Sequence, residues 1–229
     1  MNQTVFPCAN LILDLDGTLV DSAPDLTRAM NHVLTEIGRP ALEPETVRHL
    51  VGQGARVLIE RGLERTGGCD GMPSVDDLLP VFLDFYRAHI ADDSRPFPGA
   101  VALLERAREA GLRLGICTNK PQAMSEQLMD HLALSRYFDV MVGGDVLPVK
   151  KPDPAHLDSV IDRLGSGPSV LLGDTETDVA AARASGVAVG IVRFGFSAIP
   201  PEQLAADFLV DAFEAVDGFL APLARPAPV

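Results

Sequence analysis

Short apolar segments alternate with amphipathic ones along most of the chain. Five apolar segments have the length of buried strands: residues 11–15, 112–117, 140–142, 170–172 and 187–192. The later ones are preceded by segments with apolar residues near helical spacing, at residues 100–110, 122–132, 155–164 and 177–184. Strands that alternate with helices are typical of a parallel sheet covered by helices on both faces. The pattern therefore predicts an α/β fold with a doubly wound, Rossmann-like parallel sheet.

Residues 19–95 depart from this alternation, because they show helical periodicity without an evident strand. One apolar stripe falls within residues 26–37, and Ser22 is suited to cap that helix. A second stripe falls within residues 78–90, where Pro80 predicts a late start or a kink. We therefore expect an all-helical insertion in the α/β core. The expected domains are a core of residues 1–18 and 96–229 and a helical cap of residues 19–95.

The composition narrows the choice of compartment and partner. With 47% hydrophobic and 22% charged residues, the chain has the composition of a globular protein, and no apolar run is long enough to span a bilayer. A net charge of −13 argues against a broad nucleic-acid surface. The three cysteines are scattered, and the N-terminal region lacks the features of a signal peptide. We expect a cytoplasmic protein without a nucleic-acid or membrane partner, and its oligomeric state stays open.

Two aspartates, Asp14 and Asp16, end the first apolar segment and are followed by Gly17. Side chains in an extended segment repeat every two residues, so both carboxylates point the same way. Crowded carboxylates need a cation or a shared proton, and an aspartate can attack phosphorus to form an aspartyl-phosphate. The pair indicates phosphoryl chemistry with a divalent metal, although Asp-x-Asp-Gly alone is equally typical of a strand-to-turn transition.

Further polar groups follow the later strands, at the sheet edge where open α/β sheets bind their ligands. Thr118 and Asn119 can either bind phosphate oxygens or cap a helix. Lys151 can neutralise a phosphoryl group, although a lysine pair is ordinarily solvated. Asp174 and Asp178 can share a metal, although Asp178 can equally be a charge in the first turn of a helix.

In this order and spacing, four motifs resemble the haloacid dehalogenase superfamily of phosphatases over nearly the whole chain. The motifs are Asp14-Leu15-Asp16-Gly17-Thr18, Thr118-Asn119, Lys151-Pro152-Asp153-Pro154 and Gly173-Asp174 through Asp178. The helical insertion resembles the small α-helical cap of that superfamily. More closely, four segments are similar to bacterial phosphoglycolate phosphatases, namely residues 21–25, 51–56, 97–99 and 117–121.

The resemblance implies a role for each acidic residue. Asp14 would be the nucleophile, and Asp16 would be the general acid for the leaving group and then the base for water. We expect a protonated Asp16, because it lies beside another carboxylate and away from bulk water, whereas a metal-bound nucleophile stays ionised. Mg²⁺ would be held by the Asp14 carboxylate, the Asp16 backbone carbonyl and Asp174. Asp178 would support these ligands from behind.

The resemblance also implies the groups that bind phosphate. Thr118, Asn119 and Lys151 would surround the phosphoryl oxygens, where charge is spread in the transition state. We choose Lys151 over Lys150 because it directly precedes the Pro-x-Pro segment, and we expect Lys150 to be solvated.

The expected substrate contacts in the cap are Gly52, Gln53, Gly54 and Arg56. The glycines allow close approach of the backbone, and Arg56 can meet a carboxylate such as that of glycolate, although two glycines are equally typical of a helix-helix turn. The implied reaction is hydrolysis of 2-phosphoglycolate to glycolate and phosphate. The alternatives are a phosphatase for an amino-sugar phosphate, another small organic phosphate or pyrophosphate, then a phosphomutase, then a non-catalytic phosphate-binding module.

Overall fold

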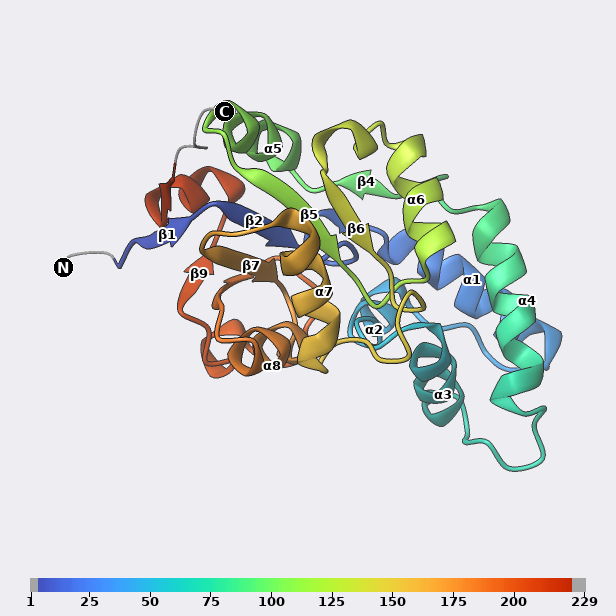
Figure 1. Cartoon of the computed structure of the whole chain (residues 1–229). Coiled ribbons are helices and arrows are strands. Elements are labelled where there is room, and N and C mark those ends of the chain that lie inside the picture. Colours follow the sequence, from blue (N-terminus) through green and yellow to red (C-terminus); the bar gives the residue numbers. More distant parts are fainter. Residues whose placement is uncertain (1–3, 224–229) are drawn as a thin grey trace.

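The computed structural model describes residues 4–223, and its centre is a six-stranded sheet (Figure 1). The strand order is β6-β5-β2-β7-β8-β9, and every neighbouring pair is parallel. The strands are β2 (Asn10–Leu13), β5 (Arg113–Cys117), β6 (Val140–Val142), β7 (Ser169–Gly173), β8 (Ala188–Val192) and β9 (Phe208–Val210). The predicted α/β fold is confirmed, and β9 is a strand that the apolar pattern did not reveal.

Helices cover both faces of the sheet, and the central strand β2 shows why its residues are apolar without a break. Leu11 and Leu13 are fully buried in one hydrophobic cluster together with side chains of α5 and α6, whereas Ile12 is buried in a second cluster with α7 and α8. A strand that is covered on both sides reads as a continuous apolar run. The core helices are α5 (Ala100–Glu109), α6 (Gln122–His131), α7 (Pro154–Leu164) and α8 (Glu176–Ala184).

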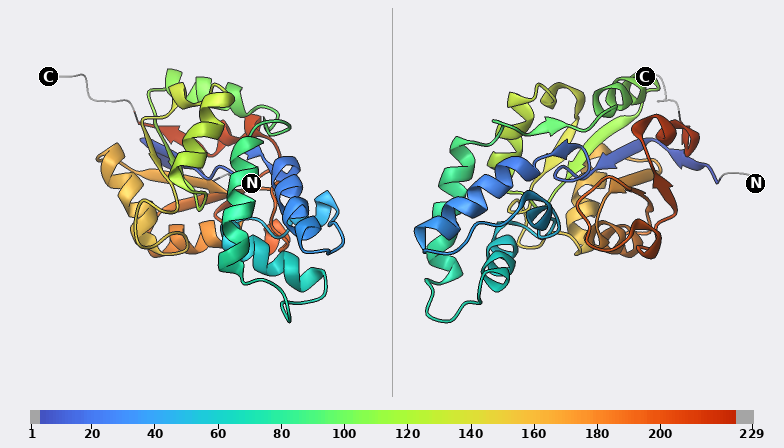
Figure 2. Two further views of the ribbon diagram at one scale, coloured as in Figure 1. Left: turned by 90° about the vertical axis from the view of Figure 1, so that its right-hand side faces the viewer. Right: turned by 180° about the vertical axis from the view of Figure 1, so that it is seen from behind.

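Four helices lie within residues 19–95, and Figure 2 shows them gathered at one end of the molecule. They are α1 (Ala23–Glu36), α2 (Pro44–Arg48), α3 (Ala55–Arg65) and α4 (Val75–Ala88). A capping box between Ser74 and Asp77 starts α4, which continues through Pro80. Ser22 precedes α1 without a side-chain capping bond, contrary to the expectation for that residue.

The two chain segments that join the insertion to the core lie side by side. They form a short antiparallel pair of β3 (Val20–Asp21) and β4 (Arg95–Pro96). Buried Asp25 holds the returning segment, because its carboxylate accepts hydrogen bonds from the backbone of Asp93 and from the backbone and hydroxyl of Ser94. The insertion therefore leaves and re-enters the core at one point, beside the carboxyl end of β2.

Short elements complete the fold. β1 (Phe6–Cys8) pairs in parallel with β10 (Leu220–Pro222), which brings the two ends of the described chain together. Three 3₁₀ turns, η1 (Ser135–Tyr137), η2 (Pro201–Gln203) and η3 (Phe213–Gly218), lie in the connections. Within the part of the chain that the structure describes, no helix combines the length and the apolar character needed to cross a membrane.

Candidate active site

Asp14 lies directly after β2 and is almost completely buried. Its Oδ1 atom accepts a hydrogen bond from the Leu15 amide (2.7 Å) and lies 3.0 Å from the ammonium nitrogen of Lys151. Burial raises the pKa of Asp14 to about 7, with Lys151 opposing this shift and the Asp178 carboxylate adding to it. The buried strand end thus presents a carboxylate whose charge depends on the cation behind it.

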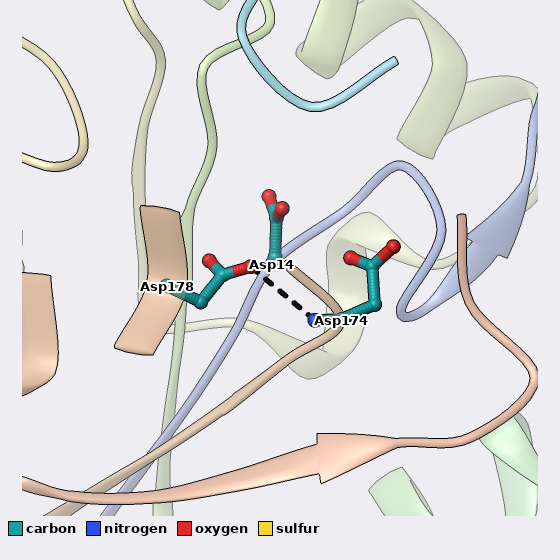
Figure 3. A group of neighbouring side chains, drawn as sticks. All are labelled: Asp14, Asp174 and Asp178. Carbon is teal, nitrogen blue, oxygen red and sulfur yellow. Dashed lines mark hydrogen bonds between the residues drawn. The ribbon is translucent and has the colours of Figure 1, made fainter. Parts of the chain in front are cut away.

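Three carboxylates, of Asp14, Asp174 and Asp178, meet at the carboxyl ends of β2 and β7 (Figure 3). One oxygen from each lies within 4.8 Å of the others, and all three residues are buried. Burial, followed by the charges of Asp178 and Asp14, raises the pKa of Asp174 well above its usual value. Three hard oxygen donors with a surplus of negative charge fit a divalent cation such as Mg²⁺.

Asp174 is fixed in place by groups from two distant segments. Thr18 donates a hydrogen bond to its Oδ1 (2.9 Å), and the Phe196 amide donates to its Oδ2 (2.7 Å). Gly17 passes beside this carboxylate with a φ of +85°, and a Cβ atom there would collide with Asp174. The Asp-Gly-Thr turn after β2 therefore needs its glycine to let Asp14 and Asp174 approach each other.

The lone pairs of Asp178 are occupied by protein donors. Its Oδ1 lies 2.7 Å from the Lys151 ammonium, and its Oδ2 accepts bonds from the Thr175 amide (3.0 Å), the Thr175 hydroxyl (2.8 Å) and the Asp174 amide (3.2 Å). Asp178 therefore holds Lys151 and the turn from β7 to α8, an arrangement that suits the supporting position expected for it.

His156 of α7 supports the Lys151 segment. Its Nδ1 atom accepts a hydrogen bond from the Lys151 amide (3.2 Å), so the ring proton lies on Nε2, which faces the Gly143 carbonyl (3.1 Å). Burial, and then the charge of Lys151, lower the pKa of His156. A neutral imidazole thus fixes the backbone of the lysine that pairs with Asp14.

Thr118 and Asn119 follow β5 and are both buried. The Thr118 hydroxyl accepts a bond from the Lys120 amide (3.2 Å). The side-chain amide of Asn119 donates to the carbonyls of Gly52 and Lys151, each at 3.0 Å. Asn119 therefore ties the loop before α3 to the core, and its amide protons are engaged rather than free for a phosphate.

Asp16 has a different environment from the expected one. Its carboxylate is bounded by a cation and a hydroxyl: Lys120 Nζ lies 3.2 Å from both of its oxygens, and the Ser22 hydroxyl donates to Oδ1 (2.6 Å). Lys120 is buried, and burial lowers its pKa while Asp16 opposes the shift. Its ammonium also donates to the Tyr86 hydroxyl of α4 (2.5 Å). The neighbours of the Asp16 carboxylate are therefore a cation and a hydroxyl, in place of the second carboxylate that was expected beside it.

Lys120 and Tyr86 were not among the residues singled out from the sequence. Lys120 belongs to the 117–121 segment that carries the resemblance, and its place directly after Asn119 was the available signal. Tyr86 gave none beyond its place in an apolar stripe, because its partner lies 34 residues away in the core.

A cavity of about 40 Å³ lies between the sheet edge and the helical insertion. Its lining includes both aspartates of the first motif, the two glycines of the loop before α3 and several apolar side chains. The lining residues are Asp14, Asp16, Leu26, Val51, Gly52, Gly54, Ala55, Leu58, Phe82, Leu83, Tyr86, Thr118, Asn119, Lys120, Pro121 and Met124. The structure thus brings together residues of the first and second motifs and the insertion, with Lys151 and Asp174 behind Asp14.

The loop before α3, residues 52–54, reaches the cavity through its two glycines, while the side chains of Gln53 and Arg56 point elsewhere. Gly52 and Gly54 line the cavity, whereas the Gln53 side chain points to Glu176 (3.3 Å). Lys150 was expected to be solvated, but it is half-buried because its ammonium donates to the Gln53 carbonyl (2.8 Å). Arg56 lies outside the cavity lining, with its side chain 46% exposed and paired with Asp76. The expected contact between Arg56 and a substrate carboxylate has no support in this arrangement.

Comparison with known proteins adds a family to this geometry. The family model "Haloacid dehalogenase-like hydrolase" matches residues 11–192. A phosphoglycolate phosphatase of Caulobacter vibrioides is 41% identical over 207 residues, which are 90% of this chain and 87% of that protein. A plasmid-encoded phosphoglycolate phosphatase of Cupriavidus necator is 42% identical and covers 100% of this chain and 99% of its own length.

Solved structures show the same relationship. The crystal structure of a predicted phosphoglycolate phosphatase from Haemophilus somnus superimposes with a TM-score of 0.85 at 28% identity, covering 91% of this chain and 96% of that one. CbbY from Rhodobacter sphaeroides, solved in complex with phosphate, has a TM-score of 0.78 at 25% identity, covering 93% of this chain and 99% of that one. These matches confirm the family and the enzyme class expected from the sequence: the chain belongs to the haloacid dehalogenase-like hydrolases.

Proposed function

We propose that this chain is a Mg²⁺-dependent phosphatase that hydrolyses 2-phosphoglycolate to glycolate and phosphate through an aspartyl-phosphate on Asp14. One observation carries the proposal. The Leu15 amide and Lys151 both contact Oδ1 of Asp14, and no donor within residues 4–223 contacts its Oδ2. Asp14 also lines the cavity, so one carboxylate oxygen is held and the other is available to attack a bound phosphoryl group.

The reaction then proceeds in two displacements. Asp14 Oδ2 forms a bond to phosphorus as the bond to the leaving oxygen breaks, and Asp16 gives a proton to that oxygen. Water next attacks the aspartyl-phosphate, Asp16 takes a proton from the water, and the Asp14 carboxylate is released. The position of Asp16 on the cavity wall supports this role. Phosphate leaves with an oxygen from water, so the cycle returns both aspartates to their starting forms.

The charge that accumulates on the phosphoryl oxygens needs fixed positive partners. We infer that Lys151 supplies one, because Asp14 and Asp178 hold its ammonium at 3.0 and 2.7 Å. Thr118 would add a hydroxyl, and Asn119 would shape the site by its ties to the loop before α3 and to Lys151. Mg²⁺ bound at Asp14, the Asp16 carbonyl and Asp174 would neutralise phosphate charge and orient the attack.

The choice of substrate rests on the relatives and on the size of the cavity. Relatives that are 41% and 42% identical carry the name phosphoglycolate phosphatase. The cavity of about 40 Å³ is small, which favours a leaving group of a few atoms over a hexose. We further infer that residues 19–95 act as a cap that encloses this leaving group and excludes water.

The buried thiols of Cys8 and Cys117 form no disulfide, which suits the cytoplasmic location expected from the sequence.

A comparison of substrates tests the proposal. The purified enzyme would be assayed with 2-phosphoglycolate, hexose phosphates, amino-sugar phosphates and pyrophosphate at one Mg²⁺ concentration. The expected result is the highest kcat/KM for 2-phosphoglycolate. A higher kcat/KM for any other compound of this set would replace 2-phosphoglycolate as the substrate, and the absence of hydrolysis of all of them would overturn the phosphatase.

A further inference from the structure

Lys120 is a buried cation at the boundary between the core and the cap. Its ammonium lies 3.2 Å from both oxygens of Asp16, 2.5 Å from the Tyr86 hydroxyl and 4.3 Å from the centre of the Tyr86 ring. Asp16 belongs to the first motif, in the core, whereas Tyr86 belongs to α4 of the insertion. Lys120 is therefore the group through which a carboxylate of the core meets a side chain of the cap.

Among the described residues that line the cavity, Lys120 is the one lysine or arginine. The other candidate cations are engaged elsewhere. Arg56 pairs with Asp76 outside the cavity, Lys150 donates to the Gln53 carbonyl, and Lys151 is held behind Asp14 by two carboxylates. A second anionic group on a substrate, distinct from its phosphate, would therefore meet Lys120.

We propose that Lys120 is the specificity-determining residue that binds the carboxylate of a small phosphorylated hydroxy acid, and that this carboxylate replaces Asp16 as the partner of the ammonium group. The inference rests on the proposed function, because it takes 2-phosphoglycolate as the substrate. In the substrate-free enzyme, Asp16 takes the position beside Lys120 that the substrate carboxylate takes on binding.

The neighbouring groups allow this exchange of partners. Asp16 keeps the hydrogen bond from the Ser22 hydroxyl when Lys120 turns away from it. The Tyr86 hydroxyl accepts a hydrogen bond from Lys120, so its own O–H can donate a hydrogen bond to the incoming carboxylate. A carboxylate between a lysine and a phenol would receive two directed hydrogen bonds, one of them charge-assisted. Binding would thereby free Asp16 from its cation at the moment when the leaving oxygen arrives beside it.

The remaining walls match a short linker between the two anions. Leu26, Phe82 and Met124 bring apolar surface to the same cavity. They can surround a methylene group, and they offer no second cation that would accept the carboxylate at another place. A substrate that lacks the carboxylate leaves Lys120 on Asp16 and gains nothing from the ammonium group.

Two substrates that differ in a carboxylate and a methyl group test the role of Lys120. The ratio of kcat/KM for 2-phosphoglycolate to kcat/KM for ethyl phosphate would be measured for the wild type, Lys120→Met and Arg56→Met. We expect Lys120→Met to lower the ratio by about 10- to 100-fold, the usual size of a buried charge-assisted hydrogen bond. Arg56→Met should change the ratio less than about threefold, because its partner Asp76 is exposed.

The outcomes separate the two hypotheses. A wild-type ratio near one would overturn the proposed substrate and the carboxylate site together. If the wild type shows a high ratio that Lys120→Met retains, with equal losses of kcat/KM for both esters, only the carboxylate site would be overturned. Lys120 would then be a positioning residue for Asp16. A fall in this kcat/KM ratio for Arg56→Met alone would show that the substrate carboxylate binds at Arg56 instead.

Two further variants keep the test independent of folding. Lys120→Arg retains the charge and should keep more of the ratio than Lys120→Met. Tyr86→Phe retains the ring but removes the hydroxyl, and it should lower the ratio by about three- to tenfold if the phenol donates to the carboxylate. Thermal unfolding of each variant would show whether it is folded. If Lys120→Met is unfolded, an unchanged ratio in folded Tyr86→Phe would count against the site.

Discussion

The two aspartates of the first motif are one residue apart, yet they belong to different halves of the site. The core half consists of Asp14, Lys151, Asp174 and Asp178, all of which are buried. The cap half consists of Asp16, Lys120 and Tyr86, and it joins the core to α4. In the core half Lys151 pairs with two of the three carboxylates, those of Asp14 and Asp178, and in the cap half Lys120 pairs with Asp16 alone. The first arrangement suits a metal and a nucleophile, and the second suits a partner that can be exchanged.

The largest expected effect concerns the nucleophile of the core half. Asp14→Asn removes the charged oxygen but keeps the shape of the side chain, so we expect kcat to fall by at least about 10³-fold while the fold is retained. Steady-state kinetics with 2-phosphoglycolate and circular dichroism of the same preparation would check this. Substantial activity in the folded variant would place the nucleophile elsewhere.

Removal of metal tests the core half as a cation site. Treatment with EDTA should lower activity by about 100-fold or more, because a bound divalent ion contributes several kcal/mol of charge stabilisation in such reactions. Added Mg²⁺ should restore activity to the chelated enzyme. Full activity in the presence of EDTA would show that the cluster of Asp14, Asp174 and Asp178 acts without a metal.

The lysine of the core half should matter for stability as well as for catalysis. Lys151→Met leaves the buried carboxylates without their cation, so we expect the metal-free protein to lose about 3–5 kcal/mol in its free energy of unfolding. The matched control is Lys150→Met, which removes one hydrogen bond to the Gln53 carbonyl and should cost about 1 kcal/mol. Urea unfolding of both variants would measure the difference, and equal losses would refute the special role of Lys151.

A smaller effect is expected in the pH dependence of stability. Burial raises the pKa of Asp14 from 3.8 to about 7, so the folded, metal-free protein binds this proton more tightly than the unfolded chain. The contribution of Asp14 to the free energy of unfolding therefore falls as the pH rises from about 4 to about 7. Asp14→Asn lacks this titration, so its stability relative to the wild type should rise across that window. Urea unfolding in EDTA at several pH values would show it, and a constant difference would contradict the assigned environment.

The core half was predictable because local sequence builds it. Asp14 follows a continuous apolar run, and Asp174 follows another, so parallel pairing of β2 with β7 is enough to bring them together. Glycine at position 17 marked the turn that this approach requires. The fold class and the acidic cluster could therefore be inferred from short segments, whereas β9 was not recognised although it is as long as the predicted strand β6.

The cap half depends on contacts between segments far apart in the sequence, and there the contacts differ from the expected ones. Arg56 was a reasonable partner for a carboxylate until the packing of α3 and α4 placed Asp76 beside it. Asp16 was expected beside a carboxylate, but the turn after β2 directs it toward Lys120 and Ser22. Neither outcome can be read from spacing, because each depends on how the helices of the insertion meet the sheet.

Direct detection of the covalent intermediate tests the central claim. Enzyme that is turning over 2-phosphoglycolate with Mg²⁺ would be quenched in acid, digested and analysed by mass spectrometry. We expect a phosphoryl group on Asp14 in the wild type and none in Asp14→Asn. Asp16→Asn should carry more of it than the wild type, because the attacking water lacks its base. Phosphorylation at another residue, or hydrolysis by the wild type without any phosphorylated Asp14 in the Asp16→Asn variant, would contradict it.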